Sequence, residues 1–147
     1  MKITTTWKEK MLFEASDGAV SGLMDAKAPL GTDRAPTPKQ WALAGTAGCS
    51  AMDVISLMRK HKQPVGKFWI DAEAATTDPK QSPVTFTRID LTFHFEGDGL
   101  DPAKALEAVT LSQTKYCGVT AMMTKHCPVY WKVVVNGSPA GEGQASF

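Results

Sequence analysis

The chain lacks both a disulfide framework and an excess of either charge. Its 147 residues include only three cysteines, whereas small disulfide-stapled domains carry larger, even sets. Sixteen basic and 15 acidic residues leave a formal net charge of +1. Electrostatics therefore favour neither nucleic acid nor an anionic membrane surface as a partner.

Long hydrophobic runs and secretory signals are also missing. No apolar run approaches the roughly 20 residues that span a bilayer, so we expect no membrane partner. The first 16 residues, MKITTTWKEKMLFEAS, contain no apolar segment typical of a secretory signal. We therefore expect a cytoplasmic protein, in which a cysteine pair is more often reactive or metal-binding than structural.

The pattern of apolar and polar residues predicts an α+β protein with mostly antiparallel strand pairing. A chain of this length fits one domain, residues 1–147. Strand patterns occupy residues 2–7, 11–16, 19–28, 66–76, 84–97 and 129–137, and helical patterns follow residues 37, 101 and 117. The 138–147 segment is typical of a tail or an edge strand.

The first helix has the clearest boundary signals. Thr37 is a good N-cap, Pro38 suits the first helical position, and Gln40 completes a capping box. Residues 41–58 are apolar almost all round, with Asp53 as the one charge, so we expect this helix to be buried on most sides. Small residues, namely Ala42, Ala44, Gly45, Ala47 and Gly48, let another backbone approach closely. A second copy of the protein is the simplest source of the missing cover.

The three cysteines admit different interpretations. Cys127 precedes Pro128 at a strand start and is expected to be a small buried hydrophobe. For Cys49, simple packing and a reactive thiol paired with Cys117 both remain open. Small neighbours leave the Cys49 sulfur unshielded, and Cys117 falls at a helix start, where the dipole favours a thiolate.

No other pattern indicates a site. A metal site needs three or four suitably spaced ligands, and the sequence has neither C-x-x-C nor paired histidines, so we expect no metal. His61, His94 and His126 each have a structural interpretation. The segment GTDRAP lacks the spacing of a phosphate-binding loop, so no nucleotide cofactor is expected either.

Two segments together resemble the OsmC/Ohr family of cysteine-based peroxide-handling proteins, most closely its OsmC-like branch. They are APTPKQWALAGTAGCSAMDVISLMRK, residues 35–60, and LSQTKYCGVTAMM, residues 111–123. The order and lengths of the predicted elements agree over essentially the whole chain. The resemblance implies an antiparallel sheet of about six strands, a long buried central helix, two shorter helices and an intertwined homodimer.

The resemblance also implies a chemistry. Cys49 would be the peroxidatic cysteine, which attacks a small organic hydroperoxide, and Cys117 would be the resolving cysteine, near the dimer interface. An external dithiol, for some members a lipoylated protein, would reopen the resulting disulfide, with no bound cofactor.

The activating groups depart from the family pattern. Peroxidase members carry an acidic residue ten positions before the reactive cysteine and an arginine from an earlier strand. Here Lys39 replaces the acid, and residues 2–28 contain no arginine. Lys39 and the loop residue Arg34 are the candidate thiolate-activating groups. The sequence therefore predicts a weaker or differently tuned peroxidase, or alternatively a non-catalytic dimer that binds an apolar small molecule.

Overall fold

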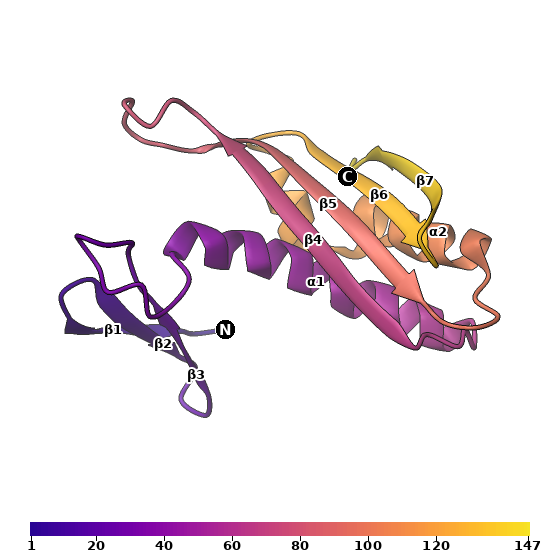
Figure 1. The fold of residues 1–147 in the computed structure, drawn as a ribbon, viewed down its shortest axis with the longest axis horizontal. Coiled ribbons are helices and arrows are strands. Elements are labelled where there is room, and N and C mark those ends of the chain that lie inside the picture. Colours follow the sequence, from indigo (N-terminus) through magenta and orange to yellow (C-terminus); the bar gives the residue numbers. More distant parts are fainter. The chain divides into compact units, whose positions relative to one another are not determined.

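Seven strands and three α-helices make up the protein, which confirms the predicted α+β class. A computed structural model describes all residues, Met1–Phe147, and divides them into two compact units, Met1–Ala42 and Leu43–Phe147 (Figure 1). The single domain expected from the length stays a prediction. The elements are β1 Thr4–Glu9, β2 Leu12–Ser16, β3 Ser21–Met24, α1 Pro38–Lys60, β4 Lys67–Thr76, β5 Phe86–Glu96, α2 Pro102–Leu111, the π-helical segment η1 Ser112–Tyr116, α3 Gly118–Met123, β6 Val129–Val135 and β7 Ser138–Gln144.

The smaller unit is an antiparallel sheet in the order β1-β2-β3, followed by a loop that hydrogen bonds to Asp25 hold in place. Asp25 is 1% exposed and accepts backbone hydrogen bonds from Ala26, Thr32 and Arg34. The hydroxyl of Thr32, with these backbone donors, lowers the pKa of Asp25 to about 2. Gly31 is required in the same loop, because a Cβ there would lie 1.9 Å from the Ala26 carbonyl oxygen.

The start of α1 confirms the predicted capping box. The Gln40 N–H donates to Thr37 Oγ1 at 3.3 Å, and the Thr37 N–H donates to Gln40 Oε1 at 2.8 Å. Pro38 is the first helical residue, and the helix ends within the basic cluster, at Lys60.

In the single chain α1 is buried along one side, and the burial of its other sides by a second copy stays a prediction. Its buried residues, Thr46, Ser50, Val54 and Met58, recur at every fourth position and form one stripe. Met52 on another side is 78% exposed. The reason is that the sheet formed by β4, β5, β6 and β7 can cover only one side of the helix, even where the other sides of the helix are apolar.

Helix α1 is the segment that bears on the expectation of no membrane partner, which stays a prediction. An 18-residue stretch of this 23-residue helix has a mean hydropathy of 1.2. By length and composition only, the helix is therefore long and apolar enough to cross a membrane. Core helices of soluble proteins pass the same test. Leucine, isoleucine, valine and methionine supply most of the apolar character of α1, and Val54 and Met58 pack into the protein core.

The larger unit contains a second sheet, in the order β4-β5-β6-β7. The predicted single antiparallel sheet of about six strands is therefore replaced by two sheets. Strand β5 pairs antiparallel with β4 and parallel with β6, whereas β6 and the edge strand β7 are antiparallel. The parallel pair arises because α2, η1 and α3 lie between β5 and β6, and such a crossover returns the chain in its original direction.

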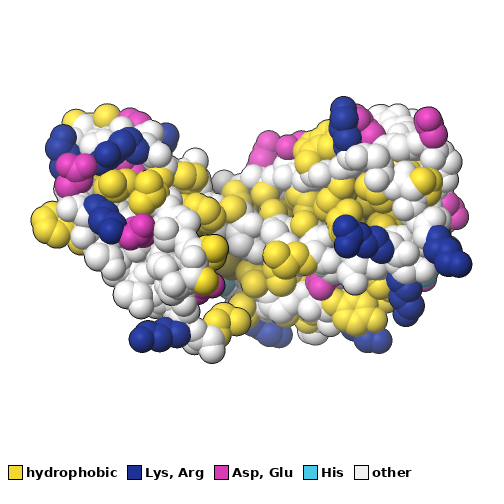
Figure 2. Space-filling view, turned by 90° about the horizontal axis from the view of Figure 1, so that it is seen from below, with side chains coloured by type: hydrophobic (Ala, Val, Ile, Leu, Met, Phe, Trp, Pro, Cys, Tyr) yellow, Lys and Arg dark blue, Asp and Glu magenta, His cyan; other side chains and the backbone are white.

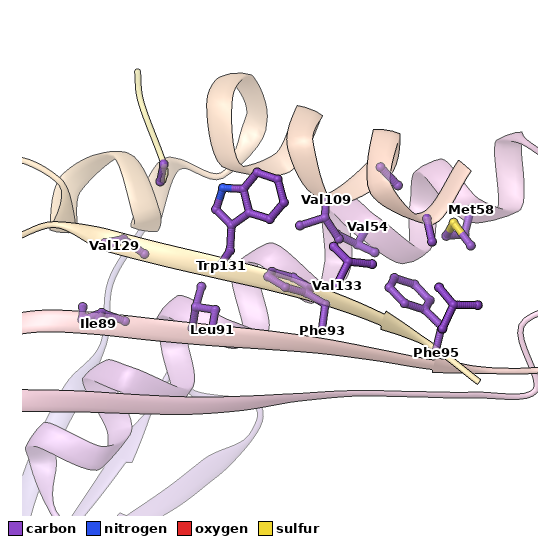
Figure 3. Close-up of a cluster of buried hydrophobic side chains, with 14 of the residues drawn as sticks. Val54, Met58, Ile89, Leu91, Phe93, Phe95, Val109, Val129, Trp131 and Val133 are labelled. Carbon is purple, nitrogen blue, oxygen red and sulfur yellow. The ribbon is translucent and has the colours of Figure 1, made fainter. Parts of the chain in front are cut away.

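One face of the four-stranded sheet forms the main core. The alternation in β5 places Ile89, Leu91, Phe93 and Phe95 on this face, each at most 1% exposed. Figure 3 shows these side chains, with Val129, Trp131 and Val133 of β6, pointing toward Val54 and Met58 of α1 and Val109 of α2. The core thus holds α1 and α2 against the same face, and this packing determines which α1 side chains meet the segment after α2.

Candidate active site

Cys49 and Cys117 come together from different elements of the larger unit. Cys49 lies on α1 beside the buried stripe and is half-buried. Cys117 is the N-cap residue of α3, as the sequence predicted, and is fully buried. The two sulfur atoms and a carboxylate oxygen of Asp53 all lie within 4.8 Å of one another. Both thiols are free, and a small movement would bring them to the roughly 2.05 Å of an S–S bond.

Buried hydrogen-bond donors surround the sulfur of Cys117. Ser50 Oγ and Thr120 Oγ1 donate to it at 3.2 and 3.1 Å, and the Thr120 N–H donates at 3.4 Å. Ser50 Oγ in turn accepts from Gln113 Nε2 at 2.8 Å. Ser50, Gln113 and Thr120 are each 0% exposed. Donors placed in this way hold the Cys117 side chain in one orientation.

The environment of Cys49 disfavours its thiolate form. Burial raises the pKa of the Cys49 thiol, and the nearby Cys117 and Asp53 side chains add to this increase. Only the backbone N–H of Val119 acts in the other direction, by hydrogen-bonding the sulfur. Cys49 is therefore mainly a neutral thiol at pH 7 unless a further group activates it.

Asp53 lies one helical turn after Cys49 on α1. Burial raises the pKa of its carboxyl group, and the hydroxyl of Ser112, which donates to Asp53 Oδ2 at 3.3 Å, opposes that increase. The carboxylate is the nearest acidic group to the two sulfurs. It can accept a proton from a thiol or share a bound cation with both sulfurs.

The two candidate activating cations, Lys39 and Arg34, belong to the smaller unit. Arg34 forms an ion pair with Glu9, and its Nε donates to Thr32 Oγ1 at 2.9 Å. Lys39 is exposed in the first turn of α1. Their role at Cys49 stays a prediction.

Several residues of this cluster escaped the sequence reasoning. Asp53 is predicted only as the one charge in an apolar helix, although its spacing of four residues from Cys49 places both on one side of α1. Ser50, Gln113 and Thr120 carry no signal in the sequence, because their importance comes from burial. Ligand spacing along the chain does not reveal that Asp53 lies beside both cysteines. Cys127, by contrast, is 6% exposed within the core, as predicted.

Comparisons with known proteins define the family. The model of the OsmC-like protein family matches residues 31–132, which include both Cys49 and Cys117, and the chain belongs to this family. It is 36% identical over 129 residues to the protein YhfA of Escherichia coli (strain K12), with 85% of this chain and 90% of YhfA covered.

Solved structures show the same fold. An OsmC-like protein from Mycoplasma pneumoniae has a TM-score of 0.77 at 14% identity, over 91% of this chain and 95% of that one. An organic hydroperoxide resistance protein from Legionella pneumophila has a TM-score of 0.64 at 18% identity, over 91% and 96% of the two chains. At these identities the likeness concerns the fold alone.

Proposed function

We propose that this protein is a thiol-dependent reductase of small organic hydroperoxides that uses Cys49 and Cys117 in defence against oxidative stress. The observation that carries the proposal is the pairing of two free sulfurs within 4.8 Å, of which Cys49 is half-buried and Cys117 fully buried. An oxidant from solvent can reach Cys49, and the product can then be captured by a neighbour that solvent does not reach. The name of the Legionella relative points to the same substrate class.

The proposed cycle has three steps. The Cys49 thiolate attacks the O–O bond of the hydroperoxide; its sulfur becomes a sulfenic acid, and the alcohol leaves with one oxygen. The Cys117 thiolate then attacks the Cys49 sulfur, which forms the disulfide and releases water. An external dithiol, with a lipoylated protein as the candidate, reduces the disulfide through a mixed disulfide and is itself oxidised. No bound cofactor is needed.

Formation of the Cys49 thiolate limits the rate of the first step of this cycle. Because burial raises the pKa of Cys49, the thiolate is scarce at neutral pH. Lys39 and Arg34 are the candidate groups to favour it. Arg34 pairs with Glu9 and does not match the family position of the activating arginine, and the ammonium of Lys39 lacks a planar guanidinium's geometry. We therefore expect slower oxidation than in family members that keep the arginine–acid pair.

We also propose a cytoplasmic homodimer. In the single chain, Ala51, Met52 and Ile55 of α1 line an open hollow together with Ser56 and Arg59. Figure 2 shows apolar side chains gathered on the surface of the larger unit. A second copy packed against this side of α1 would bury Met52, which is otherwise 78% exposed.

Stopped-flow oxidation of the fully reduced protein by cumene hydroperoxide tests the proposal. We expect wild type and Cys127→Ser to react and to form a Cys49–Cys117 disulfide, identified by mass spectrometry. Cys49→Ser should not react, and Cys117→Ser should stop at the sulfenic acid. Wild type reacting no faster than Cys49→Ser, with no disulfide, would refute the enzyme.

The alternative is a non-catalytic dimer that binds an apolar small molecule, and the raised pKa of Cys49 favours it. Such a protein would gain thermal stability from its ligand even after both cysteines are replaced. Two measurements on the variant that lacks both cysteines separate the two functions. Thermal stabilisation by an apolar ligand that survives in this variant indicates the binding protein, whereas oxidation by cumene hydroperoxide that is lost in this variant indicates the reductase.

A further inference from the structure

We propose that Cys49, Asp53 and Cys117 form a zinc-binding site. Their ligand atoms, two sulfurs and one carboxylate oxygen, lie within 4.8 Å of one another. In a tetrahedral zinc site with Zn–S near 2.3 Å and Zn–O near 2.1 Å, neighbouring ligand atoms are separated by roughly 3.5–3.8 Å. The three side chains therefore need to close by about 1 Å at most.

The positions of the three residues in α1 and at the start of α3 bring their side chains together. Cys49 and Asp53 are four residues apart on α1, so both side chains leave the same side of the helix. Cys117 comes from the end of η1, at the N-cap of α3. Ligands from two rigid segments, rather than from one flexible loop, keep their mutual distances when the ion binds.

The kind of ion follows from the ligand atoms. Two thiolates and one carboxylate suit zinc, whereas magnesium and calcium prefer oxygen ligands only. Binding releases two protons, one from each thiol, and leaves the three protein ligands with a combined charge of −3 against the +2 of the ion. Three protein ligands leave the fourth position open, and the half-buried position of Cys49 lets a water molecule reach it.

Hydrogen bonds to the ligands resemble those that orient ligands in metal sites. Ser112 Oγ donates to Asp53 Oδ2 at 3.3 Å, which orients the carboxylate. Ser50 and Thr120 donate to the sulfur of Cys117. Partners of this type hold metal ligands in place, and their loss commonly weakens metal binding about 10- to 100-fold.

Zinc at this site would hold both sulfurs reduced. This consequence rests on the proposed function, because zinc withdraws charge from the Cys49 thiolate and slows its attack on a peroxide, and Cys117 is no longer free to form the disulfide. Zinc would then inhibit the peroxidase, and removal of the ion by a chelator would restore it. The binding itself does not depend on that activity.

Titration of the reduced full-length protein with zinc, in competition with a chromophoric chelator and without oxygen or peroxide, tests the site. We expect one zinc per chain in wild type and the same affinity in Cys127→Ser. Asp53→Asn should bind at least about tenfold more weakly, and Cys49→Ser more weakly still. With cobalt as a spectroscopic probe, the sulfur-to-metal charge-transfer band should fall by about half in Cys49→Ser, since one of two thiolates is lost.

Circular dichroism of each variant controls for folding. Cys117 is fully buried, so its replacement would disturb packing as well as metal binding. The test therefore relies on Cys49→Ser and Asp53→Asn. An affinity unchanged by Asp53→Asn would refute the three-ligand site, and an affinity unchanged by Cys49→Ser would place the zinc elsewhere. Because no peroxide is present, failure here leaves the proposed reductase intact, and failure of the peroxide assay leaves the zinc site intact.

Discussion

Replacement of Ser50 by alanine tests whether the buried polar cluster stabilises the protein. The Ser50 hydroxyl donates to Cys117 Sγ and accepts from Gln113 Nε2 at 2.8 Å, with no exposure to water. In Ser50→Ala the Gln113 amide keeps only a long contact of 3.4 Å to Ser112 Oγ. The Oε1 atom of the same amide already has no partner.

The expected loss follows from these contacts. A buried polar group left without its partner costs about 1–3 kcal/mol, so we expect the free energy of unfolding to fall by about 2 kcal/mol. For a chain of this size that corresponds to a melting temperature lower by about 4–8 °C. Ser138→Ala, the same change at an exposed position of β7, should alter the free energy of unfolding by less than about 0.5 kcal/mol.

Chemical denaturation followed by circular dichroism measures both variants, at one protein concentration because a dimer's stability depends on it. A double variant, Ser50→Ala with Gln113→Leu, should recover part of the loss, because it removes the unpaired amide together with its former partner. Ser50→Ala with wild-type stability, or a double variant less stable than the sum of the two single changes, would refute the argument.

Three further predictions concern the core, the smaller unit and Cys49. Phe93→Ala should lower the free energy of unfolding by about 3–5 kcal/mol in denaturation experiments, because this side chain is 0% exposed; a loss below about 1 kcal/mol would contradict the packing. The pKa of Asp25 is lowered from 3.8 to about 2, so its contribution to stability is present above pH 3.8 and disappears as the pH falls through 2; an NMR titration of its carboxyl group with a midpoint near 3.8 would disprove this. Burial raises the pKa of Cys49, so its rate of alkylation by iodoacetamide, measured on the Cys49 peptide, should still be rising at a pH where a free thiol has levelled off; an earlier plateau would count against it.

Much of the local structure could be predicted from the sequence. The Thr37–Gln40 capping box, the Asp101 N-cap of α2 and the helix start after Cys117 all form as expected. The alternation in β5 also correctly separates its core face from its polar face. These features depend on residues within a few positions of one another, so the sequence carries the whole of the interaction.

The arrangement of strands could not be predicted in the same way. The expected single sheet is two sheets, and β5 and β6 run parallel. Strand patterns indicate which residues face a core, but not which strands become neighbours. That choice depends on contacts across tens of residues, and here the helical crossover between β5 and β6 decides it.

The candidate site was likewise predictable from the sequence only where it depends on neighbouring residues. The sequence by itself determined that Cys49 lies on a helix of small residues, that Cys117 begins another helix, and that Lys39 stands where peroxidase relatives have an acid. Only the tertiary structure placed Asp53 and the two sulfurs within 4.8 Å and surrounded Cys117 with buried donors. It also decided the direction of the Cys49 pKa shift, because that direction depends on burial and on neighbouring charges, which arise only when distant segments pack together.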